Sequence, residues 1–161
     1  MSAGAIIVLA LLVFIGITIF KGVRIVPQGY KWIVQRLGKY HTTLSPGLNF
    51  VIPYVDEVAY KITTKDIVLD IPSQEVITRD NAVLVMNAVA YINLTTPEKA
   101  VYGIENYTWA IQNLVQTSLR SIVGEMDLDD ALSSRDHIKA KLKAAISDDI
   151  SDWGITLKTV E

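Results

Sequence analysis

The chain opens with its longest uninterrupted apolar stretch. Residues 3–20 carry no charged side chain, and twelve of these eighteen residues are Ile, Leu, Val or Phe. A helix of that length spans about 27 Å, enough to cross the hydrocarbon core of a bilayer. The stretch is apolar on every side, unlike an amphipathic helix at the edge of a soluble core. We therefore expect a transmembrane helix over residues 1–20, with bilayer-embedded positions that include Ala3, Ile7, Leu11, Phe14 and Phe20.

Two other interpretations of this stretch are a cleaved signal peptide and a helix buried in a soluble core. A signal peptide has a basic start, a shorter apolar run and a small-residue cleavage site, whereas here Ile19 and Phe20 lead directly into Lys21. A buried helix of this length would be unusual in a domain as small as the one that follows. The sequence favours an uncleaved span over both alternatives.

The next fifty residues show short strand-like patterns broken by turns. Residues 30–36 and 57–62 are typical of strands, and residues 41–47 between them predict a turn. Residues 48–54 form an apolar stretch bounded by Pro46 and Pro53, which limit regular strand pairing. Such a loop either packs into the core or touches lipid, and the pattern leaves both open. The candidates for membrane-surface contact are Gly47, Leu48, Phe50, Ile52 and Pro53.

The first lobe is expected to end with a strand, and a second unit to begin near residue 73. Residues 66–71 alternate acidic and apolar side chains, as in a half-buried strand, and Pro72 is expected to end it. Residues 82–94 are apolar on both faces and predict a central strand. Helices are expected from Pro97 to Gly103, from Asn106 to Gly124 and from about residue 134 to Gly154, followed by a strand over residues 155–160.

These elements predict an α+β fold with three parts: the span at residues 1–20, a membrane-proximal lobe at 21–72 and a second lobe at 73–161. The sequence stops at Glu161 directly after a strand, without a turn or cap. We therefore expect the natural protein to continue beyond this residue.

The charges are distributed unevenly along the chain, although the net charge is only −2. Residues 21–65 hold seven basic against two acidic side chains, while residues 66–161 hold eight against fifteen. The basic residues that follow the span predict an outside N-terminus and a cytoplasmic soluble part. The same residues are suited to anionic headgroups, or they serve only to orient the span. The acidic second half argues against nucleic-acid binding, and the absence of cysteine excludes disulfides and thiol nucleophiles.

No pattern for catalysis emerges from the sequence. It contains no phosphate-binding glycine loop followed by Lys and Ser or Thr, no Gly-x-Ser-x-Gly elbow and no His-Glu-x-x-His helix. We expect no catalytic residue, cofactor or metal, and both histidines, His41 and His137, are interpreted as surface residues. Arg120 and Arg135 are candidate inter-subunit or structural charges. Arg120 lies among apolar helix positions, where it either meets a carboxylate or an interface, or stays exposed.

Several separated motifs resemble one known family. They are the run from Val26 to Tyr40, the segment from Leu44 to Phe50, residues 71–81, residues 119–124 with Leu132 and Arg135, and residues 153–155. In this order they resemble an SPFH (band 7) domain from about residue 23 to the end. Within that family the chain is most similar to stomatin-like proteins of the paraslipin and QmcA type.

The resemblance implies an SPFH1 lobe on the membrane, an SPFH2 lobe above it, and a long coiled-coil helix that builds rings or cages and is not included in these residues. It also implies a non-catalytic scaffold in the plasma (inner) membrane that organises lipids and proteins. The implied partners are membrane lipids, further copies of the chain, and an NfeD-like protein or a membrane-anchored AAA protease. The alternatives are a lipid-binding module and a membrane-anchored hydrolase or protease subunit, whose activity a partner would have to supply.

Overall fold

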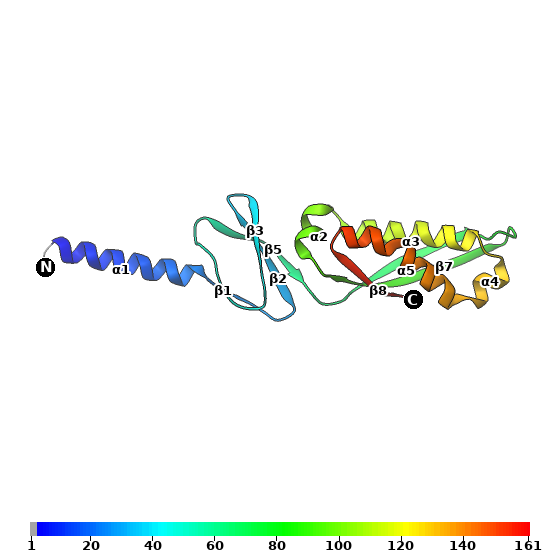
Figure 1. The fold of residues 1–161 in the computed structure, drawn as a ribbon, viewed down its shortest axis with the longest axis horizontal. Helices are drawn as coiled ribbons and strands as arrows, with labels where there is room; N and C mark the ends of the chain where they lie inside the picture. Colours follow the sequence, from blue (N-terminus) through cyan, green and yellow to red (C-terminus); the bar gives the residue numbers. More distant parts are fainter. Residues whose placement is uncertain (1–2) are drawn as a thin grey trace. The chain divides into compact units, whose positions relative to one another are not determined.

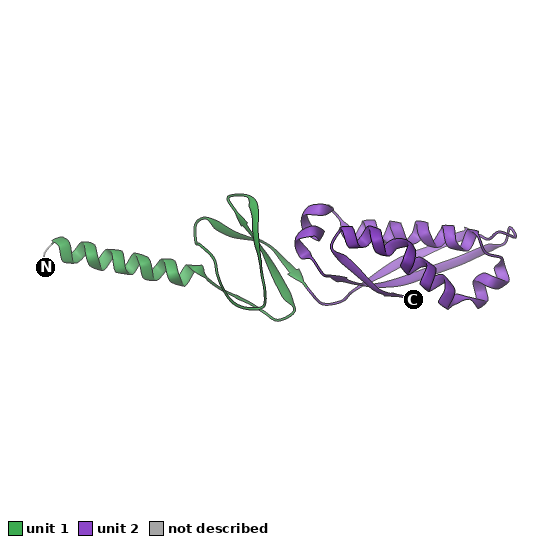
Figure 2. Ribbon diagram, viewed as in Figure 1, with its two compact units in different colours: residues 1–63 green, residues 64–161 purple. Residues whose placement is uncertain are grey.

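The computed structural model describes residues 3–161 and shows alternating helices and antiparallel strands, which confirms the α+β class. The chain divides into two compact units, one ending at Thr63 and the other covering Thr64–Glu161 (Figure 2). Each unit has its own sheets and its own buried side chains.

The first unit begins with the expected apolar helix, α1 (Ala3–Gly22) (Figure 1). The side chains of its apolar run stay exposed in the described chain, and Ile7, Leu11 and Phe14 each expose more than half of their surface. The single hydroxyl, that of Thr18, donates to the backbone oxygen of Phe14 at 2.8 Å. A helix with this exposure is not the core helix of a soluble domain. Its length and composition fit a membrane span.

The strands of the first unit form two small antiparallel sheets. One pairs β1 (Val23–Val26) with β4 (Gly47–Phe50). The other has the order β3-β2-β5, from β3 (Lys39–Leu44), β2 (Tyr30–Arg36) and β5 (Asp56–Thr63). The buried cluster between them consists of Val26, Val34, Leu44 and Val51, with Trp32 and Val58 packed against it.

Two sequence predictions for this unit were wrong. Residues 41–44 are not a turn but the end of β3, paired with β2, and the turn lies at Leu37 and Gly38, which both have positive φ. Two consecutive positive φ values are typical of a tight two-residue hairpin. The segment from Gly47 to Phe50 is a strand rather than a loop. Its flanking prolines lie outside the ladder, so neither removes a pairing N–H.

The second unit is one three-stranded sheet covered by helices on one face. The strand order is β6-β7-β8, formed by β6 (Ile67–Ile77), β7 (Val83–Leu94) and β8 (Ile155–Val160). The central position of β7 confirms the prediction for residues 82–94. The helices α3 (Tyr107–Gly124) and α5 (Arg135–Asp152) lie side by side along the sheet (Figure 1). Their buried side chains meet those of the sheet, such as Ile92, Ile111 and Ile146.

Strand β6 continues through the position where the sequence predicted its end. It pairs with β7 on both sides of an irregularity between Ile71 and Gln74. Pro72 is tolerated because it lies in this bulge on an edge strand, where no ladder N–H is needed. The boundary between the compact units accordingly falls between Thr63 and Thr64, not between residues 72 and 73 as the sequence suggested.

The helix boundaries largely follow the predicted signals. Asn106 accepts a hydrogen bond from the Trp109 N–H at 3.0 Å and caps α3, and Pro97 begins α2 (Pro97–Gly103). Gly154 follows α5 with a φ of +69°, and an added Cβ there would lie 2.5 Å from the Thr96 carbonyl oxygen. The short helix α4 (Leu128–Ser133) was not predicted, because six residues carry too little periodicity.

Candidate functional site: two surfaces and a groove

The two-stranded sheet of the first unit presents an apolar face to solvent. Ile25 on β1 lies directly opposite Leu48 on β4, and the two side chains expose 70% and 77% of their surface. Phe50, two residues further along β4, exposes 63%. We call Ile25, Leu48 and Phe50 the apolar ribbon face. Exposed apolar side chains gathered in this way mark a surface that meets an apolar partner.

The predicted membrane-contact residues lie on or beside this ribbon. Leu48 and Phe50 belong to the face itself, and Gly47 begins the same strand. Ile52 is half exposed and Pro53 is partly buried in the segment that follows. The buried residue in this region is Val51, which the prediction did not include. Leu48, Phe50 and Ile52 therefore do not pack into the core, and their contact with lipid stays a prediction.

The end of the apolar helix is fastened to this ribbon. The N–H of Val51 donates to the carbonyl oxygen of Gly22 at 2.8 Å. A Cβ at Gly22 would lie 2.7 Å from the Val51 oxygen and 3.1 Å from the Phe50 ring, so this contact requires glycine. The next side chain back, Lys21, has its Nζ 5.6 Å from the centre of the Tyr54 ring. The backbone directly after Lys21, the first charged residue beyond the apolar run, is thus held by close contacts.

An ion pair in the same unit holds the segment that follows β4. Arg36 on β2 donates from Nε to Oδ1 of Asp56 at 2.7 Å and from a terminal nitrogen to Oδ2 at 3.0 Å. The N–H of Ile52 donates to the same carboxylate at 2.9 Å. The Asp56 side chain is only 3% exposed. The hydrogen bonds from Arg36 lower the pKa of Asp56 to about 2, and its charge is balanced inside the unit.

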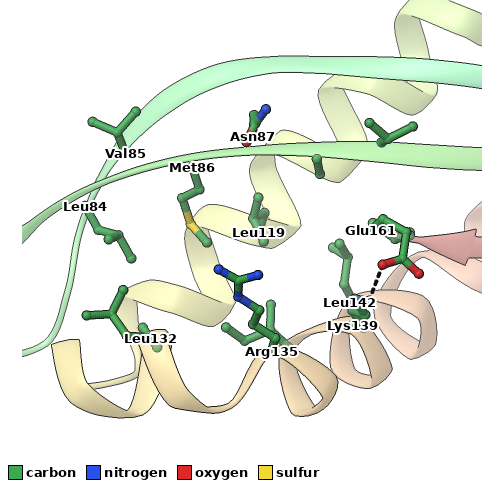
Figure 3. A pocket seen from close by; sticks show the side chains of 15 residues that line it. Leu84, Val85, Met86, Asn87, Leu119, Leu132, Arg135, Lys139, Leu142 and Glu161 are labelled. Carbon is green, nitrogen blue, oxygen red and sulfur yellow. Dashed lines mark hydrogen bonds and ion pairs between the residues drawn. The ribbon is translucent and has the colours of Figure 1, made fainter.

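The second unit contains a groove between β7 and the helices, shown in Figure 3. Its cavity volume is about 360 Å³, and its walls are mainly apolar side chains such as Met86, Leu119 and Leu142. It opens where β7 extends beyond β8. Within the described chain no strand pairs with residues 83–88 on the side away from β6. An ion pair between Lys139 and Glu161 lies at the rim.

The two singled-out arginines lie in different places. Arg135, the first residue of α5, is exposed and lines the groove in Figure 3. Arg120 is exposed on α3 and donates to Oε1 of Gln74 on β6 at 2.9 Å. Gln74 in turn donates to the Gln116 carbonyl oxygen on α3. Arg120 therefore meets an amide rather than a carboxylate, and the inter-subunit role of both arginines stays a prediction.

The polar motif at residues 78–81 has a structural role that sequence reasoning missed. Thr78 is 3% exposed, and its backbone N–H and side chain both bond to the carbonyl of Ala82, which closes the turn between β6 and β7. Arg79 pairs with Asp127 at the start of α4. A positive φ at Asn81 completes the turn. These polar residues fasten the hairpin to α4.

The sheet face opposite the helices is uncovered within the second unit. It exposes Val68 on β6 and both Val83 and Val85 on β7, each by more than half. Their alternation with buried neighbours follows from the strand period of two. This uncovered sheet face is a second apolar surface that could meet a partner.

The described residues contain no group of three or more His, Asp or Glu side chains placed to hold a metal ion. Both histidines are exposed and lie in different units. The features gathered here are surfaces suited to binding: an apolar span with a basic exit, an apolar ribbon face, an uncovered sheet face and an apolar groove.

Comparison with known proteins gives consistent matches. Residues 24–161 match the profile of the family described as SPFH domain / Band 7 family. An uncharacterized protein of Mycobacterium tuberculosis is 36% identical over 159 residues, which are 99% of this chain and 42% of that protein. One from Methanocaldococcus jannaschii is 41% identical over 143 residues, 89% of this chain and 71% of that protein. Human mitochondrial stomatin-like protein 2 is 38% identical over 133 residues, 83% of this chain and 37% of that protein. The chain thus spans less than half the length of the mycobacterial and human relatives.

Proposed function

Because the chain belongs to the SPFH domain / Band 7 family, we propose that it is a non-catalytic subunit of a scaffold that organises a patch of membrane and confines membrane proteins within it. Membership of this family supports a membrane-associated scaffold role in general. The observation that carries the proposal is the continuous family match over residues 24–161, which begins directly after the apolar helix α1. A span followed by this domain holds the domain at the bilayer surface.

Confinement by this protein requires many copies. One span and two small units cannot enclose a membrane area, so the scaffold needs subunits that repeat around a closed interface. The uncovered sheet face, with Val68, Val83 and Val85, supplies an apolar surface of the kind that an interface buries. We propose a homo-oligomeric ring or cage in the plasma membrane, with an NfeD-like protein or a membrane-anchored AAA protease as its partner.

A second candidate is a membrane-surface lipid-binding module that acts as a monomer. The apolar ribbon face favours it, because Ile25, Leu48 and Phe50 expose most of their surface beside the end of the span. This surface suits the scaffold as well, because contact with the bilayer would hold the domain of every subunit at the same distance from the membrane. The two candidates therefore differ in assembly rather than in membrane contact.

The size of the full-length protein in mild detergent tests the proposal. We expect light scattering and electron microscopy to show large closed particles at micromolar concentration. Substituting Val83→Glu together with Val85→Glu should reduce them to small species, because buried interface charges without partners are strongly unfavourable. The matched control is Thr117→Glu, an exposed position on α3.

Circular dichroism establishes that each variant is folded before its size is interpreted. A wild-type protein that stays monomeric under these conditions contradicts the scaffold and leaves the lipid-binding module as the better account. Large particles that persist in the double variant would show that subunits associate through another surface than the uncovered sheet face.

A further inference from the structure

A pocket opens beside the end of α1, within the first unit. Its cavity volume is about 520 Å³, and it is lined by Phe20, Lys21, Arg24, Val51, Pro53, Tyr54 and Asp56. We propose that this pocket binds the phosphate of an anionic phospholipid, with Lys21 and Arg24 as its cationic ligands. The inference rests on the membrane anchoring in the proposed function and names the class of lipid that the anchored domain selects.

The charge inside the pocket is positive and uncompensated. Arg24 is exposed and the structure gives it no ion pair within the described chain, while Lys21 contacts the ring of Tyr54. The one carboxylate among the lining residues, that of Asp56, is occupied by Arg36 and by the Ile52 N–H. Two cations therefore face an open space whose acidic residue is already neutralised. A phosphate group satisfies both, because guanidinium and ammonium groups are the common phosphate ligands in proteins.

The pocket lies at the depth of lipid phosphates when α1 spans a bilayer. The uncharged part of the helix ends at Phe20 and is about 27 Å long, which matches the hydrocarbon thickness. Lys21 follows immediately and therefore enters the headgroup layer. The Tyr54 ring, 70% exposed, fits the same layer, where aromatic side chains with a polar end accumulate.

The backbone that carries the two cations is held in place before any ligand binds. The hydrogen bond from Val51 to Gly22 and the close approach of Phe50 to Gly22 fix the helix end against β4. Arg24 lies on β1, directly opposite Asn49 in the ladder. The two cations thus start from positions held by backbone contacts, which reduces the entropy lost when a headgroup binds.

The source of the phosphate is a membrane lipid rather than a soluble ion. A pocket at the end of a span adjoins the acyl chains that carry the headgroup, and Phe20, 85% exposed, provides an apolar contact beside the cations. Two positive charges favour a lipid with net negative charge over a zwitterionic one, whose own cation competes with them.

Native mass spectrometry of the full-length protein, released from detergent after titration with phosphatidylglycerol or phosphatidylcholine, tests the inference. We expect phosphatidylglycerol to bind more tightly than phosphatidylcholine. Lys21→Gln with Arg24→Gln should weaken phosphatidylglycerol binding by about tenfold or more. Lys31→Gln with Lys39→Gln removes the same charge from β2 and β3 and should change binding less than about twofold.

Conservative exchange separates charge from fold: Lys21→Arg with Arg24→Lys should keep the binding of wild type. Equal binding by the Gln pair and wild type would overturn the inference, as would loss of binding in the conservative pair. Displacement of the lipid by millimolar inorganic phosphate would show a soluble-anion site and overturn the lipid assignment. Particle size is measured on the same samples, so a failed scaffold and a failed headgroup site give different results.

Discussion

At the scale of single residues, the Arg36–Asp56 pair makes the stability of the first unit depend on pH. The two residues face each other across β2 and β5, and the hydrogen bonds from Arg36 lower the pKa of Asp56 from 3.8 to about 2. A carboxyl whose pKa is lower in the folded state stabilises the fold above its unfolded pKa. That contribution is lost as the pH falls from near 4 through about 2.

We expect Asp56→Asn to lower the free energy of unfolding of the first unit by about 1–3 kcal/mol at neutral pH, because the variant loses the charged hydrogen bonds. Hydrogen-exchange mass spectrometry of peptides from residues 23–63, with residues 64–161 as an internal reference, measures the change. At the folded pKa about half of the wild-type carboxyl groups are protonated, so thermal unfolding near pH 2 should show a smaller difference between the two proteins than thermal unfolding at neutral pH. A difference that does not shrink on acidification would contradict this assignment.

Gly154 is a second residue whose identity is dictated by its surroundings. Its positive φ and the nearby Thr96 carbonyl leave no room for a side chain. We expect Gly154→Ala to destabilise the second unit by about 1–3 kcal/mol from backbone strain alone. Gly103→Ala is the control, since an added Cβ there meets nothing within 4 Å. Chemical denaturation followed by circular dichroism should separate the two variants, and equal midpoints would refute the argument.

At the scale of elements, the sequence predicted most clearly what one local signal determines. The apolar run of α1, the Asn106 cap of α3 and the long apolar stretch of β7 each gave an element of the right type. The errors occurred where pairing decides the structure. β3 is polar and half exposed, and it is a strand because β2 lies beside it. β6 crosses Pro72 because a bulge absorbs the missing donor.

The candidate surfaces also divide into parts that a local signal predicts and parts that depend on strand pairing. The apolar residues of β4 were recognised from composition, but their partner Ile25 was not, because the pairing of β1 with β4 joins residues far apart in the chain. The pocket at Lys21 and Arg24 depends on the same pairing and on the contact of Gly22 with Val51. The sequence therefore indicated that this region is basic, whereas only the fold shows that Lys21 and Arg24 line one pocket.

The apolar ribbon face makes a prediction that the cysteine-free sequence allows to be tested with single labels. A nitroxide attached to Leu48→Cys in the full-length protein, reconstituted in vesicles, should be reached by oxygen more readily than by a water-soluble nickel complex. The reason is that oxygen concentrates in the lipid that this side chain is expected to touch. Thr117→Cys on α3 provides the aqueous reference. A label at residue 48 with the accessibility of the reference would place the face in water.

At the scale of the whole molecule, we predict an outside N-terminus and a cytoplasmic soluble part. Five basic residues follow the span within twenty positions, and no basic side chain precedes it: Lys21, Arg24, Lys31, Arg36 and Lys39. Positive charge is retained on the cytoplasmic side during insertion. Alkaline phosphatase fused after Glu161 should therefore be inactive in a bacterial host, and a cytoplasmic reporter at the same position should be active. The reverse pattern would overturn the orientation.

The open edge of β7 has a consequence for handling a polypeptide made of residues 1–161 alone. Residues 82–94 contain no charge and no proline, which is the composition of segments that form intermolecular cross-β stacks. Most of this run is shielded by its neighbours, but over residues 83–88 one side of the strand offers free backbone donors and acceptors in the described chain. An open strand edge of this kind is a template for aggregation. In preparations of these residues, fibrillar or amorphous precipitate is expected to start from this edge, and a charged residue at Val83 or Val85, whose side chains are exposed on the same strand, would act as a gatekeeper against it.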